Sequence, residues 1–437
     1  MARMNLPANF MEIRRQQERI VSEYHVQKSP PLSGAVELST SKNSLLPILA
    51  ATLLTGDEVV IHKMANLTDV YIMCELLKTL GAKMDMRGSD AVIRCDAITS
   101  REAPDELVQK MRASFLLMGP LLARFGRAKI PLPGGCEIGT RPVDLHLKGF
   151  HALGAAIRTQ QGALLAEGAV LRGTTIYLDY PSVGGSENIM MAAALAEGET
   201  CLINAAREPE IVDLANFLNA MGARVEGAGT DIMRITGVAR LHGCEYTPIS
   251  DRIEAGTLMA AAALTGGDIT LQRAMPQHLR PISAKLREGG ADVWEQEGAI
   301  RIRGSWLPLA VDIKTMPWPG FPTDLQPQAM VLCALSKGAS IITETVFENR
   351  FMHIPELTRM GADIRTKDRS AVIEGVNRLY GATVRATDLR AGAALVLAGL
   401  VAEGDTRVLH GEYIDRGYEN LAAKLRALGA NVEAIGT

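Results

Sequence analysis

Two glycine markers each recur six times along this chain of 437 residues, at steps of roughly 70 residues. The first marker is a Gly-Ala pair that ends a helical pattern, at Gly81, Gly154, Gly222, Gly290, Gly361 and Gly429. The second is a glycine that ends an Ala/Leu-rich run, at Gly56, Gly126, Gly198, Gly267, Gly338 and Gly404. Because two separate markers share one period, the chain must fold as six similar units.

Each repeat combines two helices with several short strands, and the third repeat is the clearest. Residues 188–197 form an apolar helical run, residues 200–204 a short strand, and residues 210–221 an amphipathic helix. A hairpin-like segment, ARVEGAGTDIMRITG, follows. We therefore predict a βαβαββ unit whose first helix is apolar on nearly all sides and buried.

The two ends of the chain indicate how the repeats are grouped. Only eight residues follow Gly429, enough for one strand but not for a hairpin. Two strand-like segments, 23–27 and 34–40, precede the first repeat helix, and we expect them to complete the sixth unit. The pattern is interrupted at 241–250. We predict an α/β fold of two three-repeat domains, one at 42–249 and a discontinuous one at 1–41 plus 250–437. Residues 1–19 form either a short extra helix or a disordered segment.

Composition excludes several classes of function. The 46 Lys and Arg nearly balance the 49 Asp and Glu, and aromatic residues make up 4%. We therefore expect no binding to nucleic acid or to a membrane surface. The charged N-terminus has no signal-peptide core, and apolar runs such as 46–55 are too short to span a bilayer.

Cysteine and histidine usage predicts neither a metal site nor a disulfide framework. The six Cys and eight His lack the spacing of zinc ligands, and the chain has no GxxxxGK[ST] phosphate loop. Most cysteines lie in apolar or strand-like runs, which favours a reducing, cytoplasmic compartment.

The starts of the predicted buried helices carry charge. The residues fourteen positions before the helix-ending glycines are Lys42, Arg112, Gly184, Ile253, Asp324 and Arg390. A cation is unfavourable at a helix N-terminus, so these side chains either extend to solvent or converge on an anion. We favour an anion site. On that interpretation, removing Lys42 or Arg390 weakens anion binding and hardly changes stability.

Two further segments have both a structural and a functional interpretation. Residues 181–186, Pro-Ser-Val-Gly-Gly-Ser, offer backbone N–H groups to a phosphate or simply form a turn with Ser182 as helix cap. The glycine-rich loop around Cys136, with Arg141 close by, is typical of a reactive thiol or proton donor, which we prefer over a buried, inert cysteine.

Several long motifs resemble one known family. They are SKNSLLPI (41–48), KMRASFLLMGPL (110–121), LPGGCEIGTRPVDLH (132–146), FPTDLQPQ (321–328), ETVFENRFMH (344–353), ATDLRA (386–391) and IDRGYENL (414–421). They are similar to the UDP-N-acetylglucosamine 1-carboxyvinyltransferase family of enolpyruvyltransferases, from about residue 23 to the C-terminus. The resemblance implies a two-domain inside-out α/β barrel of six βαβαββ units, which agrees with the repeat count.

The resemblance also implies roles for individual residues. Cys136 would be the proton donor and Asp324 the base or the group that orients the acceptor, although Asp324 could instead cap its helix. The implied anion pocket for phosphoenolpyruvate comprises Lys42, Arg141, Arg350, Arg390 and Arg416. The implied UDP-N-acetylglucosamine site comprises Asn43, Arg112, Arg141, Pro142, Val143, Asp144, Leu145, Ser182, Val183, Gly184, Asp324 and Val346. Some members have lysines where this chain has Asn66, Thr68 and Tyr180.

The implied reaction is enolpyruvyl transfer from phosphoenolpyruvate to the sugar 3-hydroxyl by addition and elimination, the first committed step of peptidoglycan synthesis. We expect no cofactor and no metal, and a monomer in the cytoplasm. The alternatives are a shikimate-pathway enolpyruvyltransferase, transfer to another nucleotide, and an inactive paralogue that only binds the nucleotide.

Overall fold

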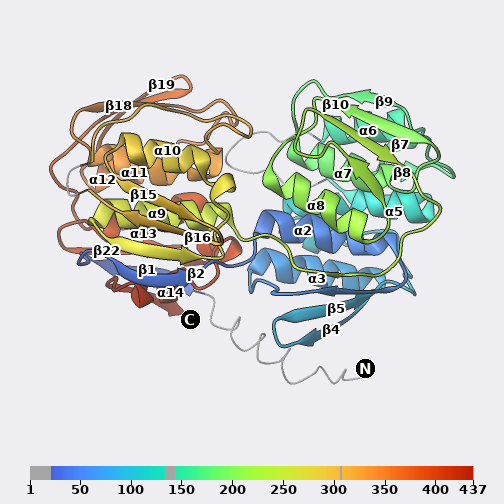
Figure 1. Ribbon diagram of the computed structural model, residues 1–437, viewed down its shortest axis with the longest axis horizontal. Coiled ribbons are helices and arrows are strands. Elements are labelled where there is room, and N and C mark those ends of the chain that lie inside the picture. Colours follow the sequence, from blue (N-terminus) through green and yellow to red (C-terminus); the bar gives the residue numbers. More distant parts are fainter. Residues whose placement is uncertain (1–20, 133–142, 306–307, 437) are drawn as a thin grey trace. The chain divides into compact units, whose positions relative to one another are not determined.

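The computed structural model describes residues 21–132, 143–305 and 308–436, so the predictions for residues 1–19 lie outside the described residues. The chain divides into two compact units (Figure 1). The inserted unit contains the described residues from Thr40 to Ile249. The split unit contains the described residues up to Ser39 and from Ser250 onward. Each unit has its own hydrophobic core.

The described strands form three sheets in each unit. The strands of the inserted unit are β3 (Glu58–Ile61), β4 (Lys83–Arg87), β5 (Asp90–Arg94), β6 (Arg127–Pro131), β7 (Ala156–Gln160), β8 (Ala163–Glu167), β9 (Thr175–Tyr177), β10 (Glu199–Ile203), β11 (Arg224–Glu226), β12 (Ile232–Thr236) and β13 (Glu245–Tyr246). Those of the split unit are β1 (Val21–Gln27), β2 (Ser33–Glu37), β14 (Asp268–Gln272), β15 (Asp292–Gln296), β16 (Ala299–Arg303), β17 (Ile313–Lys314), β18 (Ala339–Thr343), β19 (Asp363–Lys367), β20 (Ser370–Glu374), β21 (Thr383–Arg385), β22 (Asp405–Leu409) and β23 (Val432–Gly436).

Helices of two kinds alternate along the chain. The first helix of each repeat is α2 (Lys42–Ala51, continued by η1, Thr52–Leu54), η2 with α5 (Arg112–Leu117 and Met118–Phe125), α7 (Val183–Ala193), α9 (Arg252–Thr265), η4 with α11 (Thr323–Leu325 and Gln326–Ala334) or α13 (Leu389–Gly399). The second is α3 (Thr68–Leu80), α6 (Asp144–Ala152), α8 (Pro209–Ala220), α10 (Arg280–Glu288), α12 (Ile354–Arg359) or α14 (Leu421–Ala427). Short additional turns are α4 (Asp105–Val108), η3 (Pro276–His278) and η5 (Gly411–Arg416).

The first helices are buried, as predicted from their apolar sequences. In α9 only Arg252 and Leu264 are not fully buried. In the split unit α9, α11 and α13 pack on one another, with strands around them (Figure 1). In the third repeat α7 occupies 183–193, so it begins one residue before Gly184, the predicted helix start, and ends before the predicted apolar run 188–197 does. The Ser182 side chain accepts a hydrogen bond from the Gly185 N–H at this start.

The glycines of the Gly-Ala pairs end their helices through their backbone conformation. All six have a positive φ, between 92° and 111°. Residues with a Cβ rarely adopt this left-handed region, whereas glycine does so without steric cost. The repeat period in the sequence therefore comes from a conformational requirement at the end of each second helix.

Five of the six repeats receive a described parallel edge strand from the segment that precedes them in the ring, and the second repeat receives only an isolated parallel bridge, between Glu102 and Lys129. In the inserted unit, β9 pairs with β10, and β13, at the end of the third repeat, pairs with β3 of the first. In the split unit, β17 pairs with β18 and β21 with β22. Because the last strand returns to the first repeat, the three repeats of the inserted unit form a closed ring.

The N-terminal strands close the second ring, but in different sheets. As predicted, β1 joins the sixth repeat, where it lies antiparallel between β22 and β23 and replaces the missing hairpin strand. The prediction for the second strand was wrong, because β2 pairs in parallel with β14 of the fourth repeat. It supplies the edge strand that the preceding segment of the chain supplies in other repeats.

Candidate active site

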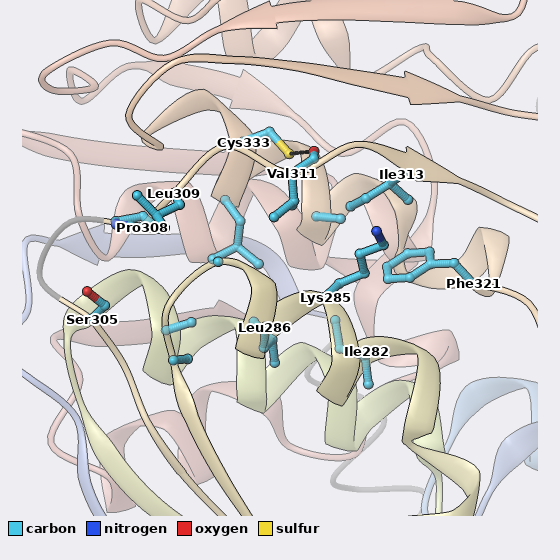
Figure 2. A pocket seen from close by; sticks show the side chains of 15 residues that line it. Ile282, Lys285, Leu286, Ser305, Pro308, Leu309, Val311, Ile313, Phe321 and Cys333 are labelled. Atoms are coloured by element: carbon cyan, nitrogen blue, oxygen red, sulfur yellow. Dashed lines mark hydrogen bonds between the residues drawn. The ribbon is translucent and has the colours of Figure 1, made fainter.

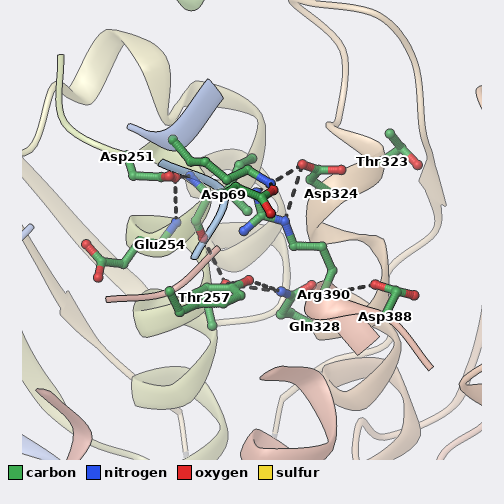
Figure 3. Close-up of polar contacts among 12 residues, drawn as sticks. Asp69, Asp251, Glu254, Thr257, Thr323, Asp324, Gln328, Asp388 and Arg390 are labelled. Carbon is green, nitrogen blue, oxygen red and sulfur yellow. Dashed lines mark hydrogen bonds and ion pairs between the residues drawn. The ribbon is translucent and has the colours of Figure 1, made fainter. Parts of the chain in front are cut away.

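Three charged side chains of the split unit, Asp324, Arg350 and Arg390, meet at the starts of two buried helices. Figure 3 shows Asp324 and Arg390. Asp324 lies in η4 at the start of the fifth repeat, and its Oδ1 atom is 2.8 Å from Arg350 Nη1. Its Oδ2 atom accepts from Arg390 Nη2 at 3.1 Å and from Arg390 Nε at 3.3 Å. The N-cap of η4 is Pro322, so Asp324 does not cap this helix, which was the structural alternative for Asp324.

Both arginines are buried, and each has a buried side-chain nitrogen without a hydrogen-bond partner among the described residues. The exposed fraction is 3% for Arg350 and 1% for Arg390. Arg350 Nε and Arg390 Nη1 have no hydrogen-bond partner among the described residues. Burial lowers the pKa of Arg390, but its contacts with Tyr418 and Asp324 outweigh this effect and raise the pKa above its usual value. Two charged guanidinium groups with spare donors and one carboxylate leave a net positive site for an anion.

These positions correct the expectation that removing Arg390 hardly changes stability. That expectation assumed a side chain whose loss only relieves the helix dipole. Arg390 is instead packed in the interior and holds a carboxylate, so its removal leaves a cavity and a weakened ion pair. Its side chain does not extend to solvent.

A buried glutamate, Glu344, connects this trio to Val346. Glu344 Oε2 accepts from Thr323 Oγ1 at 2.8 Å, and Arg350 Nη1 donates to the same threonine oxygen at 3.1 Å. Glu344 Oε1 accepts from the Val346 N–H at 2.8 Å. The segment that follows β18 is thereby fixed beside the start of η4.

Asp side chains already use the N–H groups at two of the helix starts. Asp388 accepts from Arg390 N and Ala391 N at the start of α13, and Asp251 caps α9 in the same way. At these two helices an anion would therefore be bound by side chains. At α2 the N-cap, Ser41, makes no side-chain cap bond.

In the inserted unit, Lys42 at the start of α2 is buried beside a carboxylate of α3. Its Nζ atom is 3.3 Å from Asp69 Oδ2, and the two residues are 9% and 3% exposed. The countercharge of Lys42 comes from the second helix of its own repeat, whereas that of Arg390 comes from the preceding repeat. Lys42 therefore does not extend to solvent either. Asn43, the next residue of α2, is half-buried.

Several residues of the predicted nucleotide site lie around His146 of α6. A Cβ on Gly184 would lie 3.1 Å from the His146 ring, and one on Gly185 would lie 3.6 Å from Leu145 Cβ. Burial lowers the pKa of His146 to about 3, with a further contribution from Arg112. The starts of η2, α6 and α7 therefore converge. Ser182 caps α7, as the structural interpretation of segment 181–186 expected.

The remaining predicted residues are placed singly or lie outside the described residues. Val143 precedes α6, Asp144 begins it, and Arg416 ends η5. Cys136, Arg141 and Pro142 lie outside the described residues. Asn66, Thr68 and Tyr180 all belong to the inserted unit, Thr68 as the first residue of α3.

One family model and several relatives match nearly the whole chain. The model described as EPSP synthase (3-phosphoshikimate 1-carboxyvinyltransferase) matches residues 26–425. UDP-N-acetylglucosamine 1-carboxyvinyltransferase 2 of Carboxydothermus hydrogenoformans is 57% identical over 417 residues, which is 95% of this chain and 100% of that protein. UDP-N-acetylglucosamine 1-carboxyvinyltransferase 1 of Caldanaerobacter subterraneus is 56% identical over 94% of this chain and 99% of that protein. This chain belongs to the enolpyruvyltransferase family.

Solved structures agree with this assignment. The enolpyruvyl transferase NikO from Streptomyces tendae has a TM-score of 0.85 and 26% identity, covering 95% of this chain and 99% of its own. An EPSP synthase from Acinetobacter baumannii has a TM-score of 0.74 at 18% identity over 94% and 99% of the chains, a likeness of fold alone. The protein therefore has the two-domain inside-out α/β barrel of enolpyruvyltransferases.

An apolar pocket of the split unit is a poor site for the substrates of an enolpyruvyltransferase (Figure 2). It lies between α9, α10, α11 and the segment before β17, with walls that include Leu286, Leu309 and Phe321. Its one charged lining residue is Lys285, which is paired with Glu288 at 2.6 Å. An anionic substrate needs several convergent cations, so the Asp324–Arg350–Arg390 trio is the better candidate.

Sequence reasoning missed the residues that support the charged side chains. Asp69, Glu344 and His146 were not among the predicted residues, although Glu344 and His146 lie inside matching motifs. In the described parts of the chain, no group of three or more His, Cys, Asp or Glu side chains is arranged to hold a metal, and no helix is long and apolar enough to cross a membrane.

Proposed function

We propose that this protein is a UDP-N-acetylglucosamine 1-carboxyvinyltransferase. It transfers the enolpyruvyl group of phosphoenolpyruvate to the 3-hydroxyl of UDP-N-acetylglucosamine and releases phosphate, which is the first committed step of peptidoglycan synthesis. The observation that carries this proposal is 57% identity to a protein of that name over that protein's entire length.

The chemistry needs a fixed positive site for a small, multiply charged anion. In the first step the 3-hydroxyl oxygen bonds to C2 of phosphoenolpyruvate, the hydroxyl proton leaves, and C3 gains a proton. In the second, the C2–O bond to phosphate breaks and C3 loses a proton, which restores the enol. Arg350 and Arg390, with their spare buried donors, bind the phosphate or carboxylate of the donor through these steps. Lys42, Arg141 and Arg416 complete the set.

Two guanidinium groups hold the carboxylate of Asp324 in place. We assign Asp324 to orienting the acceptor hydroxyl, and the Asp324→Asn variant decides whether it also takes the proton. Cys136 is assigned as the acid that protonates C3.

Most of the proposed nucleotide-sugar residues belong to the inserted unit. Arg112, Leu145 and the 182–184 turn are supported by their convergence at the starts of η2, α6 and α7. The other proposed residues of this site are Asn43, Pro142, Val143 and Asp144, together with Val346, which belongs to the split unit.

We propose two three-repeat domains, one at 42–249 and a discontinuous one at 1–41 plus 250–437. We also propose that the protein is a monomer and that it lies in the cytoplasm, a reducing compartment that suits the five described cysteines, which are free thiols.

Phosphate release tests the proposed activity directly. The purified protein is incubated with phosphoenolpyruvate and UDP-N-acetylglucosamine, and with each substrate omitted in turn. We expect phosphate release only when both are present, in an amount equal to the acceptor consumed. Release without the nucleotide sugar, or none with both substrates, would overturn the proposal.

A further inference from the structure

The guanidinium group of Arg390 lies over the ring of Tyr418. Its Cζ atom is 5.1 Å from the ring centroid, and each residue is 1% exposed. At this depth the negative face of the ring attracts the cation with little competition from water. Asp324 contacts Arg390 through Nε and Nη2, so the ring and the carboxylate together define where the guanidinium group lies.

The Tyr418 ring is itself fixed through its hydroxyl group. Thr257 Oγ1 lies 3.0 Å from the Tyr418 oxygen, and Gln328 Nε2 donates to the Tyr418 oxygen at 2.9 Å (Figure 3). Thr257 donates its own proton to the Ile253 carbonyl at 2.8 Å. The Tyr418 proton must therefore point to Thr257, while the Tyr418 oxygen accepts from Gln328.

These contacts join all three central helices of the split unit. Thr257 lies on α9, Gln328 on α11 and Arg390 on α13. Thr257 and Gln328 occupy the same repeat position, ten residues before Gly267 and Gly338. Both are buried, at 0% and 1% exposure. Two repeats thus hold a tyrosine that supports the arginine of the third.

We propose that Tyr418 is a positioning residue for Arg390, with Thr257 and Gln328 locking its ring. The ring fixes the guanidinium group so that Nη1, which has no partner among the described residues, is directed to the donor anion. This inference rests on the proposed function. Tyr418 acts through Arg390 and needs no contact with substrate.

The test separates the ring from the hydroxyl. Tyr418→Phe keeps the ring and loses the lock, whereas Tyr418→Leu loses both. We expect Tyr418→Leu to raise the KM for phosphoenolpyruvate roughly 10- to 30-fold, as for a lost desolvated cation–π contact, and Tyr418→Phe roughly 2- to 5-fold. The kcat should change less than about threefold in each. Tyr246→Phe, which removes a hydroxyl bonded to Asp213 in the inserted unit, is the matched control with an unchanged KM.

A double-mutant cycle shows whether Tyr418 acts through Arg390. In an Arg390→Met background, Tyr418→Leu should change kcat/KM for phosphoenolpyruvate less than about threefold, because there is no cation left to position. An equal loss in both backgrounds, or a fall in melting temperature with an unchanged KM, would overturn the positioning role.

Urea unfolding of the same four proteins measures the coupling without any substrate. A wild-type protein that releases no phosphate would overturn the proposed function, whereas additive effects on unfolding would overturn the Arg390–Tyr418 coupling itself. The two failures are therefore distinguishable. Coupled effects on both unfolding and KM would support the inference.

Discussion

Asp324 and Arg390 occupy the same position in successive repeats, fourteen residues before Gly338 and Gly404, and their side chains meet at 3.1 Å. The ring of repeats brings the starts of the buried helices together. A cation at such a start is unfavourable by itself, but the carboxylate of the neighbouring repeat compensates it. In the inserted unit the carboxylate beside Lys42, that of Asp69, comes from the second helix of the same repeat. The repeated helix-start position therefore supplies both Asp324 and Arg390 to one charged site.

Asp324→Asn tests whether Asp324 takes the proton of the acceptor. Asn is nearly the same size but cannot accept a proton, so turnover should fall roughly 10²- to 10⁴-fold if Asp324 is the base. Steady-state phosphate release measures this. Asp388→Asn is the matched control, because Asn caps α13 as well as Asp does and turnover should be nearly normal. Near-normal turnover in a stable Asp324→Asn enzyme would remove Asp324 from the mechanism as base.

Arg390→Ala should reduce both donor binding and stability. It leaves a cavity and removes one of the two cations from Asp324, at a cost of about 2–4 kcal/mol in the free energy of unfolding. Arg390→Met refills the space and should recover part of that stability but not the turnover. Arg359→Ala, at a side chain 62% exposed, should change stability by less than about 0.5 kcal/mol. Urea unfolding of Arg390→Ala with the wild-type midpoint would show that the buried pair contributes nothing.

An epoxide that mimics phosphoenolpyruvate should alkylate Cys136 first, and faster when UDP-N-acetylglucosamine is present. Burial raises the pKa of Cys74 to about 12 and those of Cys95, Cys244 and Cys333 to about 11. These four thiols are therefore poor nucleophiles at neutral pH. Peptide mapping after a short exposure identifies the modified residue, and Cys136→Ser is the control. A label on any of the other cysteines before Cys136 would contradict the assignment.

Asp415 should make the protein less stable as the pH rises. Burial raises its pKa to about 6, although the Tyr24 hydroxyl, which donates to it at 3.0 Å, acts in the opposite direction. The folded state therefore binds the proton more tightly than the unfolded state. The resulting stabilisation is complete below about pH 4 and is lost as the pH rises through about 6.

Asp415→Asn removes this dependence. Between pH 4.5 and 7.5, its unfolding free energy should rise relative to wild type by roughly 1–3 kcal/mol, measured by urea unfolding. The control is Asp268→Asn. Hydrogen bonds from Arg301 and Arg303 lower the pKa of Asp268 to about 2, so its effect lies below this pH range. A constant difference between wild type and Asp415→Asn would show that Asp415 titrates alike in both states.

The sequence predicted the parts of this structure that a period reveals. The glycines of the Gly-Ala pairs, all with positive φ, mark every repeat, and counting back from the glycines that end the Ala/Leu-rich runs locates the helix starts that carry Lys42, Asp324 and Arg390. It could not predict that β2 joins β14, because both N-terminal strands have the same pattern and only pairing distinguishes them. Nor could it predict Tyr418 or Glu344 as supports. Tyr418 is held by side chains of two other repeats, and Glu344 is held by residues of its own repeat that no period marks.

Acceptor competition followed by mass spectrometry tests the central claim most directly. The protein is given phosphoenolpyruvate with equal concentrations of UDP-N-acetylglucosamine and 3-phosphoshikimate, and each product is identified by its mass. We predict that only the nucleotide sugar gains an enolpyruvyl group, with one phosphate released per product. An enolpyruvyl group on 3-phosphoshikimate, or two unchanged acceptors, would contradict the account.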